Sequence, residues 1–435
     1  MPQTQQKTKY RWVICFFMWS AIAINYIDRA SLSAATPILM EEFNIGAAEM
    51  GLIMSAFFWA YALLQLPAGY IADKFGQRIT YSLSVAWWSI AQMCVAFAST
   101  LPGFIAARLF LGIGESGAYP CNAGVTAKWY PTHERSRVSA IFDSAAKFGA
   151  AFAMPFIVWL IAMFTWHAPF IIFGAVGLIW AILWWKFYND PHKSKYVNKA
   201  KLDYISEGKE INHNEKPQLK WYQLLKYRNI QAMCLGFFMV NYIYYFFITW
   251  FPAYLMQERG MELMTMGMVA AIPSIVAIFG EMFGGYVSDK LYMAGWSLTK
   301  ARKTNLIIGM ILATAVGFAG NVESDVLVIV LLSISSFGCV FAAAAIWSLP
   351  GDVAPKNMVS QVAGLQNCVS NMGGAIGPLV TGFIIATTNS FQISLYISGG
   401  LAFVAILIYA FYLGEVKQIE IPKEKINVKD DCYYD

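Results

Sequence analysis

The chain has 435 residues, of which 58% are hydrophobic and 13% are charged, and its formal net charge is +5. Soluble domains are roughly 45–50% apolar and about 25% charged, so this composition excludes a soluble globular protein, a disulfide scaffold, a disordered chain and a nucleic-acid binder. Because the apolar residues fall in long runs, the sequence predicts a protein that crosses a membrane several times.

A helix that spans a bilayer needs roughly 20 mostly apolar residues. The apolar runs do not alternate with polar residues as the strands of an outer-membrane barrel do, so we predict an all-α membrane protein. The twelve predicted transmembrane helices cover about residues 14–38, 50–72, 80–99, 102–124, 136–163, 168–187, 229–255, 264–287, 303–320, 325–349, 358–385 and 391–414.

The positions of Lys and Arg predict the orientation, because cytoplasmic loops carry an excess of these residues. If the N-terminus lies inside, 27 of the 31 Lys and Arg residues fall in inside segments and one, Arg259, falls in an outside loop. The other three, Arg29, Arg108 and Lys147, lie within spans. This distribution predicts that both termini are cytoplasmic.

The chain also reads as two halves. Residues 188–228 are rich in Lys, Asn and Glu and separate six spans from six. A similar phrase follows the second span of each half, at 69–74 and again at 285–290. Duplicated bundles of this kind bind their substrate between the repeats, near the middle of the bilayer. We therefore predict an N-terminal bundle over 1–187, a cytoplasmic linker over 188–228, a C-terminal bundle over 229–414 and a cytoplasmic tail over 415–435.

Signals for a cofactor or for catalysis are missing from the sequence. Its seven cysteines form no CxxC spacing, its four histidines form no ligand spacing, and there is no phosphate-binding loop. We therefore expect no metal, no cofactor and no ATP-driven step, and we predict a secondary carrier rather than an enzyme.

The phrase Gly69-x-x-x-Asp73-Lys74-x-Gly76-Gln77-Arg78 resembles the loop signature of the major facilitator superfamily. Gln77 departs from the pattern, which often has a basic residue there. The resemblance implies that Asp73, Lys74 and Arg78 form a latch at the cytoplasmic ends of the helices. The half-repeat provides a counterpart at Asp289. The alternative is a solvated turn with no such function.

Two further phrases resemble the anion:cation symporter family, whose bacterial members include proton-coupled carriers of galactonate, glucarate and hexuronates. They are Asn25-Tyr26-Ile27-Asp28-Arg29 and Arg108-Leu109-Phe110-Leu111-Gly112-Ile113-Gly114-Glu115-Ser116. The resemblance implies a multi-pass protein of the cell inner membrane. It would act as a monomer and take up a small organic anion, most often a sugar acid, together with protons.

An ionisable group at the centre of a bilayer costs roughly 2.5–3.5 kcal/mol, so each one is a functional hypothesis. By resemblance, Asp28 and Glu115 match the proton-handling carboxylates of the family. Arg29 matches its substrate-facing arginine, and Arg108 matches an arginine linked to Glu115. The alternative is a static, neutralised cluster in which Asp28 pairs with Arg29 or Arg108 and Glu115 pairs with Arg108.

Lys147 departs from the sugar-acid carriers, which often have glutamine at the matching position. A lysine here would suit the second carboxylate of a diacid. Asp143 lies four residues earlier, however, and can pair with Lys147 along the helix. Both interpretations stay open.

Three neutral residues complete the predicted substrate site by resemblance: Tyr61, Trp347 and Asn367. Gln366 and Asn371 are alternates to Asn367, because they fall on other faces of the same polar stretch.

Glu281 is the one acidic residue predicted within a C-terminal span. Pairing with a loop cation such as Lys290 or Arg302 is one interpretation of this residue, and a gate or an extra proton site is the other.

The sequence leaves open a second function in the same fold. An exchanger of organophosphate, nitrate, another carboxylate or a sulfonate would need no proton-coupling carboxylates. An intramembrane enzyme or a nutrient sensor finds no support, because no span supplies a nucleophile, a base and an orienting group together, and no large soluble signalling domain is evident.

Overall fold

The computed structural model describes residues 9–131, 134–206, 221–355 and 358–420, and every regular element in these residues is helical. The α-helices are α1 (Tyr10–Glu42), α2 (Ala47–Phe75), α3 (Gln77–Val95), α4 (Leu101–Glu115), α5 (Ala118–Trp129), α6 (Arg135–Met163), α7 (His167–Phe187), α8 (Lys199–Ser206), α9 (Arg228–Thr249), α10 (Phe251–Gln257), α11 (Leu263–Met293), α12 (Leu298–Ala313), α13 (Ala315–Ala319), α14 (Asp325–Ile346), α15 (Leu349–Val353), α16 (Val359–Thr388) and α17 (Gln392–Leu407). Shorter turns are η2 (Pro191–Lys193), η3 (Trp221–Lys226) and η4 (Ile408–Tyr412).

Within the described residues, nine helical segments are long and apolar enough to cross a membrane. The predicted spans 80–99, 102–124 and 303–320 do not reach that length and hydropathy. The last two are interrupted, because α4 ends at Glu115 before α5 begins at Ala118, and α12 ends at Ala313 before α13 begins at Ala315. The structure thus has an all-helical membrane architecture, in which two of the predicted spans are interrupted and the third, at α3, is long enough but not apolar enough.

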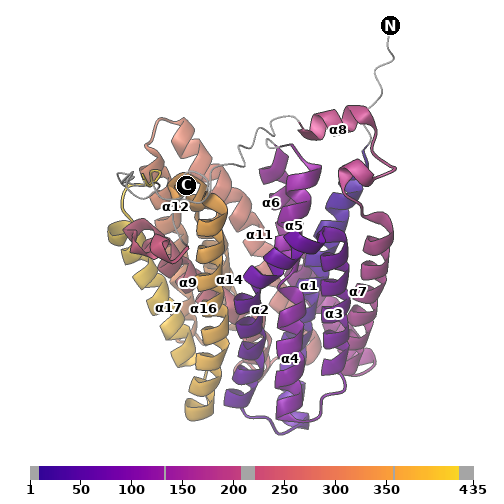
Figure 1. Ribbon diagram of the computed structural model, residues 1–435. Coiled ribbons are helices and arrows are strands. Elements are labelled where there is room, and N and C mark those ends of the chain that lie inside the picture. The colour runs from indigo at the N-terminus through magenta and orange to yellow at the C-terminus, as the bar shows by residue number, and fades with distance from the viewer. Residues whose placement is uncertain (1–8, 132–133, 207–220, 356–357, 421–435) are drawn as a thin grey trace, which may run out of the picture.

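The helices form two groups side by side (Figure 1). Helices α1–α7 pack among themselves, with α1 against α6, α3 against α7 and α2 against α4. Helices α9–α17 do the same, with α11 against α14, α9 against α16 and α12 against α14. The two groups meet mainly where α2 packs on α16 and α6 packs on α11. These two helix pairs therefore border the space between the two groups.

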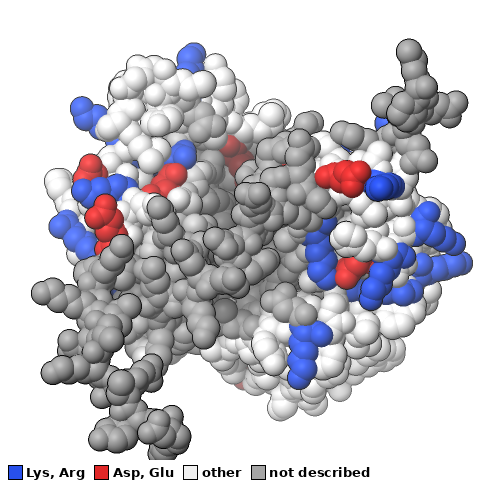
Figure 2. All heavy atoms as spheres, turned by 45° about the horizontal axis from the view of Figure 1, so that its top comes forward, with Lys and Arg blue, Asp and Glu red and all other residues white. Residues whose placement is uncertain are grey.

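One end of the molecule is basic. The start of α1, the end of α7, α8 and the region of η4 lie at the same end in Figure 1, where Tyr10 donates a hydrogen bond to the carbonyl of Phe187 (2.8 Å). Figure 2 shows Lys and Arg side chains spread over this face. Its exposed basic residues include Lys74, Lys186, Lys193, Lys195, Lys199, Lys226, Arg228, Lys290 and Lys300.

The opposite end is where the two groups lie closest. Ser33 of α1 donates to the carbonyl of Thr249 at the end of α9 (2.7 Å). Gly51 of α2 lies against the backbone of Gly382 in α16, so that a Cβ built on Gly51 would be 3.2 Å from the Gly382 Cα. Small residues let two helices approach this closely in a membrane, where packing rather than a hydrophobic driving force holds helices together. The groups are therefore joined from the middle of the molecule to the end remote from the basic face.

The four helices that form the main contact between the two groups each carry an internal proline, which removes a backbone hydrogen bond from the helix. The residues are Pro67 in α2, Pro155 in α6, Pro273 in α11 and Pro378 in α16.

Adjacent glycines in α17 test the importance of close packing. A Cβ on Gly399 would lie 2.8 Å from the Cα of Gly317, whereas a Cβ on Gly400 would meet nothing within 4 Å. Overpacking typically costs about 1–3 kcal/mol, while alanine is a better helix former than glycine. We expect Gly399→Ala to lower the unfolding temperature of the purified protein and Gly400→Ala to leave it unchanged or raised. Equal effects of the two substitutions would contradict the packing of α17 on α13.

Candidate functional site

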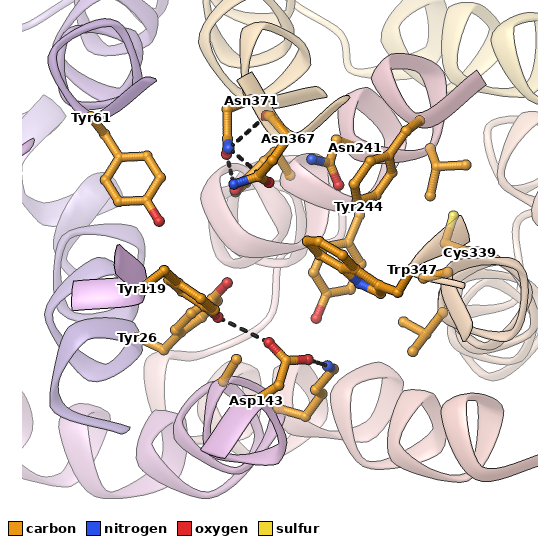
Figure 3. A pocket seen from close by; sticks show the side chains of 17 residues that line it. Tyr26, Tyr61, Tyr119, Asp143, Asn241, Tyr244, Cys339, Trp347, Asn367 and Asn371 are labelled. Atoms are coloured by element: carbon orange, nitrogen blue, oxygen red, sulfur yellow. Dashed lines mark hydrogen bonds and ion pairs between the residues drawn. The ribbon is translucent and has the colours of Figure 1, made fainter. Parts of the chain in front are cut away.

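A polar pocket lies between the two groups of helices (Figure 3). Residues of α1, α2, α5 and α6 line one side, and residues of α9, α14 and α16 line the other. The polar or aromatic residues of the lining are Tyr26, Tyr61, Tyr119, Asp143, Lys147, Phe237, Asn241, Tyr244, Tyr245, Trp347, Asn367 and Asn371. Phenol hydroxyls and side-chain amides both donate and accept hydrogen bonds, so this lining suits a ligand that carries several hydroxyl groups.

An amide network fixes one wall of the pocket. Asn367 Nδ2 donates to Gln65 Oε1 across the two groups (3.1 Å), and Asn371 Nδ2 donates to Asn367 Oδ1 (3.2 Å). The hydroxyl of Tyr245 donates to Asn371 Oδ1 (3.0 Å). These bonds link α16 to α2 and to α9, so the amides are held in place before a ligand arrives.

Lys147 lies on the opposite wall within a charged cluster. Its Nζ is 2.6 Å from Asp143 Oδ2 on the same helix and 2.9 Å from Glu281 Oε2 on α11. The hydroxyl of Tyr119 donates to Asp143 Oδ1 (3.0 Å). Lys147 therefore lines the pocket and also pairs with Asp143, so both interpretations of this residue agree with its position.

The partner of Glu281 corrects one of our sequence interpretations. The carboxylate pairs with Lys147 across the two groups rather than with Lys290 or Arg302, because it lies on the part of α11 that packs against α6. Arg302 instead donates to Asp352 Oδ2 (2.8 Å) and to the hydroxyl of Ser288 (2.8 Å).

A second charged cluster lies inside the first group of helices. Arg29 donates from Nε (3.1 Å) and Nη2 (2.9 Å) to Glu115 Oε2, and both side chains are almost completely buried. The Arg29 guanidinium carbon also lies 4.7 Å from the ring centroid of Tyr26 and 4.9 Å from that of Tyr61. Cations are attracted to aromatic faces at this range. Because both tyrosines line the pocket, Arg29 lies directly behind the pocket wall.

Arg108 is also buried, but it is not the ion-pair partner of Glu115 among the described residues; that partner is Arg29. Its guanidinium carbon lies 4.8 Å from the ring centroid of Phe57, and the guanidinium carbon of Arg29 lies 4.6 Å from the same ring. One phenyl ring thus contacts both arginines.

Asp28 is fully buried, and neither of its carboxylate oxygens has a hydrogen-bond partner within the part of the chain that the structure describes. The neighbouring amide of Gln92 donates to the backbone carbonyl of Asp28 and not to its side chain (3.3 Å). The neutralised cluster considered from the sequence therefore forms at Glu115 and not at Asp28. A carboxylate in this position can accept a proton without first breaking an ion pair.

The predicted substrate residues separate into two sets. Tyr61, Lys147, Trp347 and Asn367 line the pocket, whereas Arg29 and Arg108 do not belong to its lining.

Sequence reasoning did not single out five pocket residues: Tyr26, Tyr119, Asn241, Tyr244 and Tyr245. The run 241–245 carries a usable signal, because Asn241, Tyr244 and Tyr245 are three and four residues apart and share one helical face.

The predicted gating residues lie at the basic end. Lys74 is exposed, and its Nζ lies 5.5 Å from the ring centroid of Phe75. Arg78 donates from Nε to the carbonyl of Trp185 (2.8 Å), which connects the start of α3 to the end of α7. Asp73 and Asp289 are on α2 and α11, but their side chains lie outside the described part of the structure.

Helices that span a membrane and enclose a polar pocket at the contact of two groups define a membrane transport protein. A family model described as the Major Facilitator Superfamily matches residues 18–378 and 294–429. The chain belongs to this superfamily, and it is a secondary transporter of the inner membrane that crosses the bilayer several times.

Curated relatives resemble the chain over nearly its whole length. It is 34% identical to a D-galactonate transporter of Escherichia coli O6:H1 over 418 residues, which cover 94% of this chain and 97% of the relative. It is 35% identical to a probable galactarate/D-glucarate transporter of Escherichia coli K12 (95% and 97% covered) and 32% identical to a hexuronate transporter of Bacillus subtilis (91% and 92% covered).

The fold resembles a crystal structure of a bacterial homolog of the human lysosomal transporter Spinster. The TM-score is 0.76 with 19% sequence identity, and the match covers 93% of this chain and 97% of that chain.

The two carboxylates of the buried cluster should differ in their effect on stability. Removing one partner of a buried ion pair typically costs about 3–5 kcal/mol, so Glu115→Ala should lower the unfolding temperature strongly by leaving Arg29 unpaired. Asp28→Asn breaks no described ion pair or hydrogen bond and should cost far less. Thermal unfolding of the purified variants measures the difference, and a larger loss in Asp28→Asn would contradict the pairing of Arg29 with Glu115.

Proposed function

We propose that this protein is a proton-coupled symporter that takes up a small organic anion, and that the anion is a sugar acid. The observation that carries the proposal is a pair of buried carboxylates, Asp28 and Glu115, in the first group of helices, where Glu115 is bound to the arginine that lies behind the pocket wall. Relatives named for galactonate, galactarate/glucarate and hexuronate transport support the substrate class.

The pocket offers a sugar acid both kinds of contact that it needs. The phenols of Tyr26, Tyr61 and Tyr244 and the amides of Asn241 and Asn367 can bond to its hydroxyl groups. Its carboxylate needs a cation, which Arg29 provides behind the two tyrosines, and Lys147 inside the pocket can meet a second carboxylate where the substrate has one.

Proton coupling follows from the competition for Arg29. In this arrangement Glu115 accepts both described hydrogen bonds of the guanidinium. Protonation of Glu115 removes its negative charge and weakens the pair, so that the two donors become available to a substrate carboxylate. Such donors suit a carboxylate well. Asp28, which has no described partner, would accept a second proton.

The finer architecture also belongs to this proposal. We infer twelve transmembrane helices in two six-helix bundles, residues 1–187 and 229–414, joined by a cytoplasmic linker and followed by a cytoplasmic tail. The gathering of exposed lysines at one end of the molecule supports cytoplasmic termini, because positive residues favour that side. Asp73, Lys74, Arg78 and Asp289 would act as gating residues at this end, and the transporter would work as a monomer.

Flux into proteoliposomes tests the coupling. With an acidic exterior and a neutral interior, D-galactonate or D-glucarate should accumulate in wild type, and an opposing pH gradient should abolish the accumulation. Asp28→Asn and Glu115→Gln should each lower gradient-driven uptake by about 100-fold or more, since each removes a group that must bind and release a proton.

Counterflow, in which labelled substrate exchanges for unlabelled substrate without net proton movement, is the control for folding and binding in these variants. Uptake that ignores the pH gradient and survives both substitutions would contradict proton coupling and favour an anion exchanger. Uptake of none of these acids would contradict the substrate class.

Cysteine labelling tests the orientation. In a variant without native cysteines, Glu323→Cys lies in the turn between α13 and α14, and Lys195→Cys lies between η2 and α8. An impermeant maleimide added to intact cells should label position 323 at once and position 195 only after permeabilisation. The reverse pattern would place the basic end outside and contradict the proposed topology.

A further inference from the structure

The Lys147–Asp143–Glu281 cluster contains one cation and two carboxylates; Lys147 and Asp143 line the pocket, and Glu281 reaches Lys147 from α11. Its formal charge is therefore −1 when all three groups are ionised. A pocket that must accept an anion gains nothing from surplus negative charge, and its only described cation is already paired twice. The function of the second carboxylate therefore needs an explanation.

The two carboxylates are held differently. Asp143 lies on α6 with Lys147, four residues away, and the hydroxyl of Tyr119 donates to its second oxygen. Glu281 lies on α11, across the contact between the two groups, and nothing but Lys147 is described as its hydrogen-bond partner. Asp143 therefore fixes Lys147, and Glu281 is the partner that can be exchanged.

Exposure supports the same distinction. The Glu281 side chain is 32% exposed, compared with 23% for Asp143 and 12% for Lys147. A partly exposed carboxylate on a long side chain can move away from its partner, whereas Lys147 cannot leave without losing both partners. Exchange of one carboxylate for another at the lysine keeps the number of buried charges constant, so it avoids the large penalty of burying an unpaired ion.

Helix α11, which carries Glu281, packs closely against α14. A Cβ built on Gly280 would lie 2.7 Å from the carbonyl oxygen of Phe337, and one on Gly284 would lie 2.3 Å from that of Phe341. Helix α11 is therefore in close backbone contact with α14, which carries Cys339 and leads directly into Trp347 in the pocket wall. A change at the Lys147–Glu281 pair thus acts on the wall that a substrate touches.

We propose that Glu281 is an internal competitor for the substrate: it occupies Lys147 when the pocket is empty, and the second carboxylate of a dicarboxylate displaces it. Displacement breaks the ion pair between α6 and α11 and so links the binding of a diacid to the separation of the two groups at this point. Glu281 is then a residue that sets specificity between diacids and monoacids. This inference rests on the proposed transport of sugar acids.

Calorimetric binding to the purified, full-length transporter tests the competition, with D-glucarate as the diacid and D-galactonate as the monoacid. Glu281→Gln frees Lys147 and should lower the Kd for D-glucarate by about tenfold, a change of about 1.4 kcal/mol. The Kd for D-galactonate should change less than about threefold, since it has no second carboxylate to place there.

Two comparisons separate displacement from a general effect of charge. Asp143→Asn removes the same charge beside Lys147 but leaves the pair across α6 and α11, so it should raise D-glucarate affinity less than Glu281→Gln does. In a Lys147→Gln background, Glu281→Gln should change the Kd less than about twofold, because the shared partner is gone. Equal gains in Asp143→Asn and Glu281→Gln, or a gain that persists without Lys147, would overturn the inference.

Transport kinetics provide a second measurement, which would not change if the role of Glu281 were purely structural. Tighter binding without the competitor should lower both KM and the maximal rate of D-glucarate counterflow in Glu281→Gln. If that variant does not fold, Glu281→Asp, which keeps the charge but shortens the reach, should shift Kd and KM in the same direction. Wild type that transports sugar acids, with unchanged Kd in these variants, would overturn only this inference. Wild type that binds no sugar acid would overturn the proposed function instead.

Discussion

The Arg29–Glu115 ion pair joins α1 to the end of α4 behind the pocket wall, and the chemistry of the pocket depends on it. Both ions are removed from water, and such a pair is maintained only where geometry and further contacts offset the loss of hydration. Here the aromatic rings of Tyr26, Phe57 and Tyr61 surround the guanidinium. The same tyrosines form the pocket wall, so the surface that meets a ligand also covers the buried charge. A change in the pairing of Arg29 must therefore affect the tyrosines that form that surface.

The two sides of the pocket differ in kind. The helices before residue 188 provide the charged residues of the lining, Asp143 and Lys147, together with three tyrosines, and the helices after residue 228 provide neutral residues alone, namely amides, tyrosines, Trp347 and apolar side chains. A ligand held by both sides uses charge on one and hydrogen bonds or aromatic contact on the other. Hydrogen bonds to neutral groups discriminate by geometry, whereas a charge attracts any anion. The neutral half is thus suited to select among anions that the charged half attracts.

The sequence predicts features of the fold and the site that depend on neighbouring residues of one helix. It does not predict features that depend on which helices touch. The apolar runs predict the helices, and the rarity of ionisable residues within them identifies Asp28, Arg29, Arg108, Glu115 and Lys147. Sequence spacing along one helix also predicts the Lys147–Asp143 pair, since residues four apart share a face. The partners Arg29 and Glu115, 86 residues apart, and Lys147 and Glu281, 134 residues apart, depend on which helices touch. Spacing within a single helix contains no such information. The break after Ala313 was missed because the hydropathy stays apolar through it, and the break after Glu115 was missed although Glu115, Ser116 and Gly117 interrupt the apolar run there.

The prolines of α2, α6, α11 and α16 affect the mechanics of the molecule. A helix without one of its internal hydrogen bonds bends more easily at that turn. These four helices form the main contact between the groups, so bending at their prolines acts directly on that contact. Helix α1, which also touches the other group, has an internal proline of its own, Pro37. The segments of these helices on either side of each proline can tilt separately. The two groups can therefore separate at one end of the molecule while they stay in contact at the other end. The two groups would then not rotate as two rigid bodies about a pivot. Instead, the segments on either side of the prolines would move relative to one another within each group.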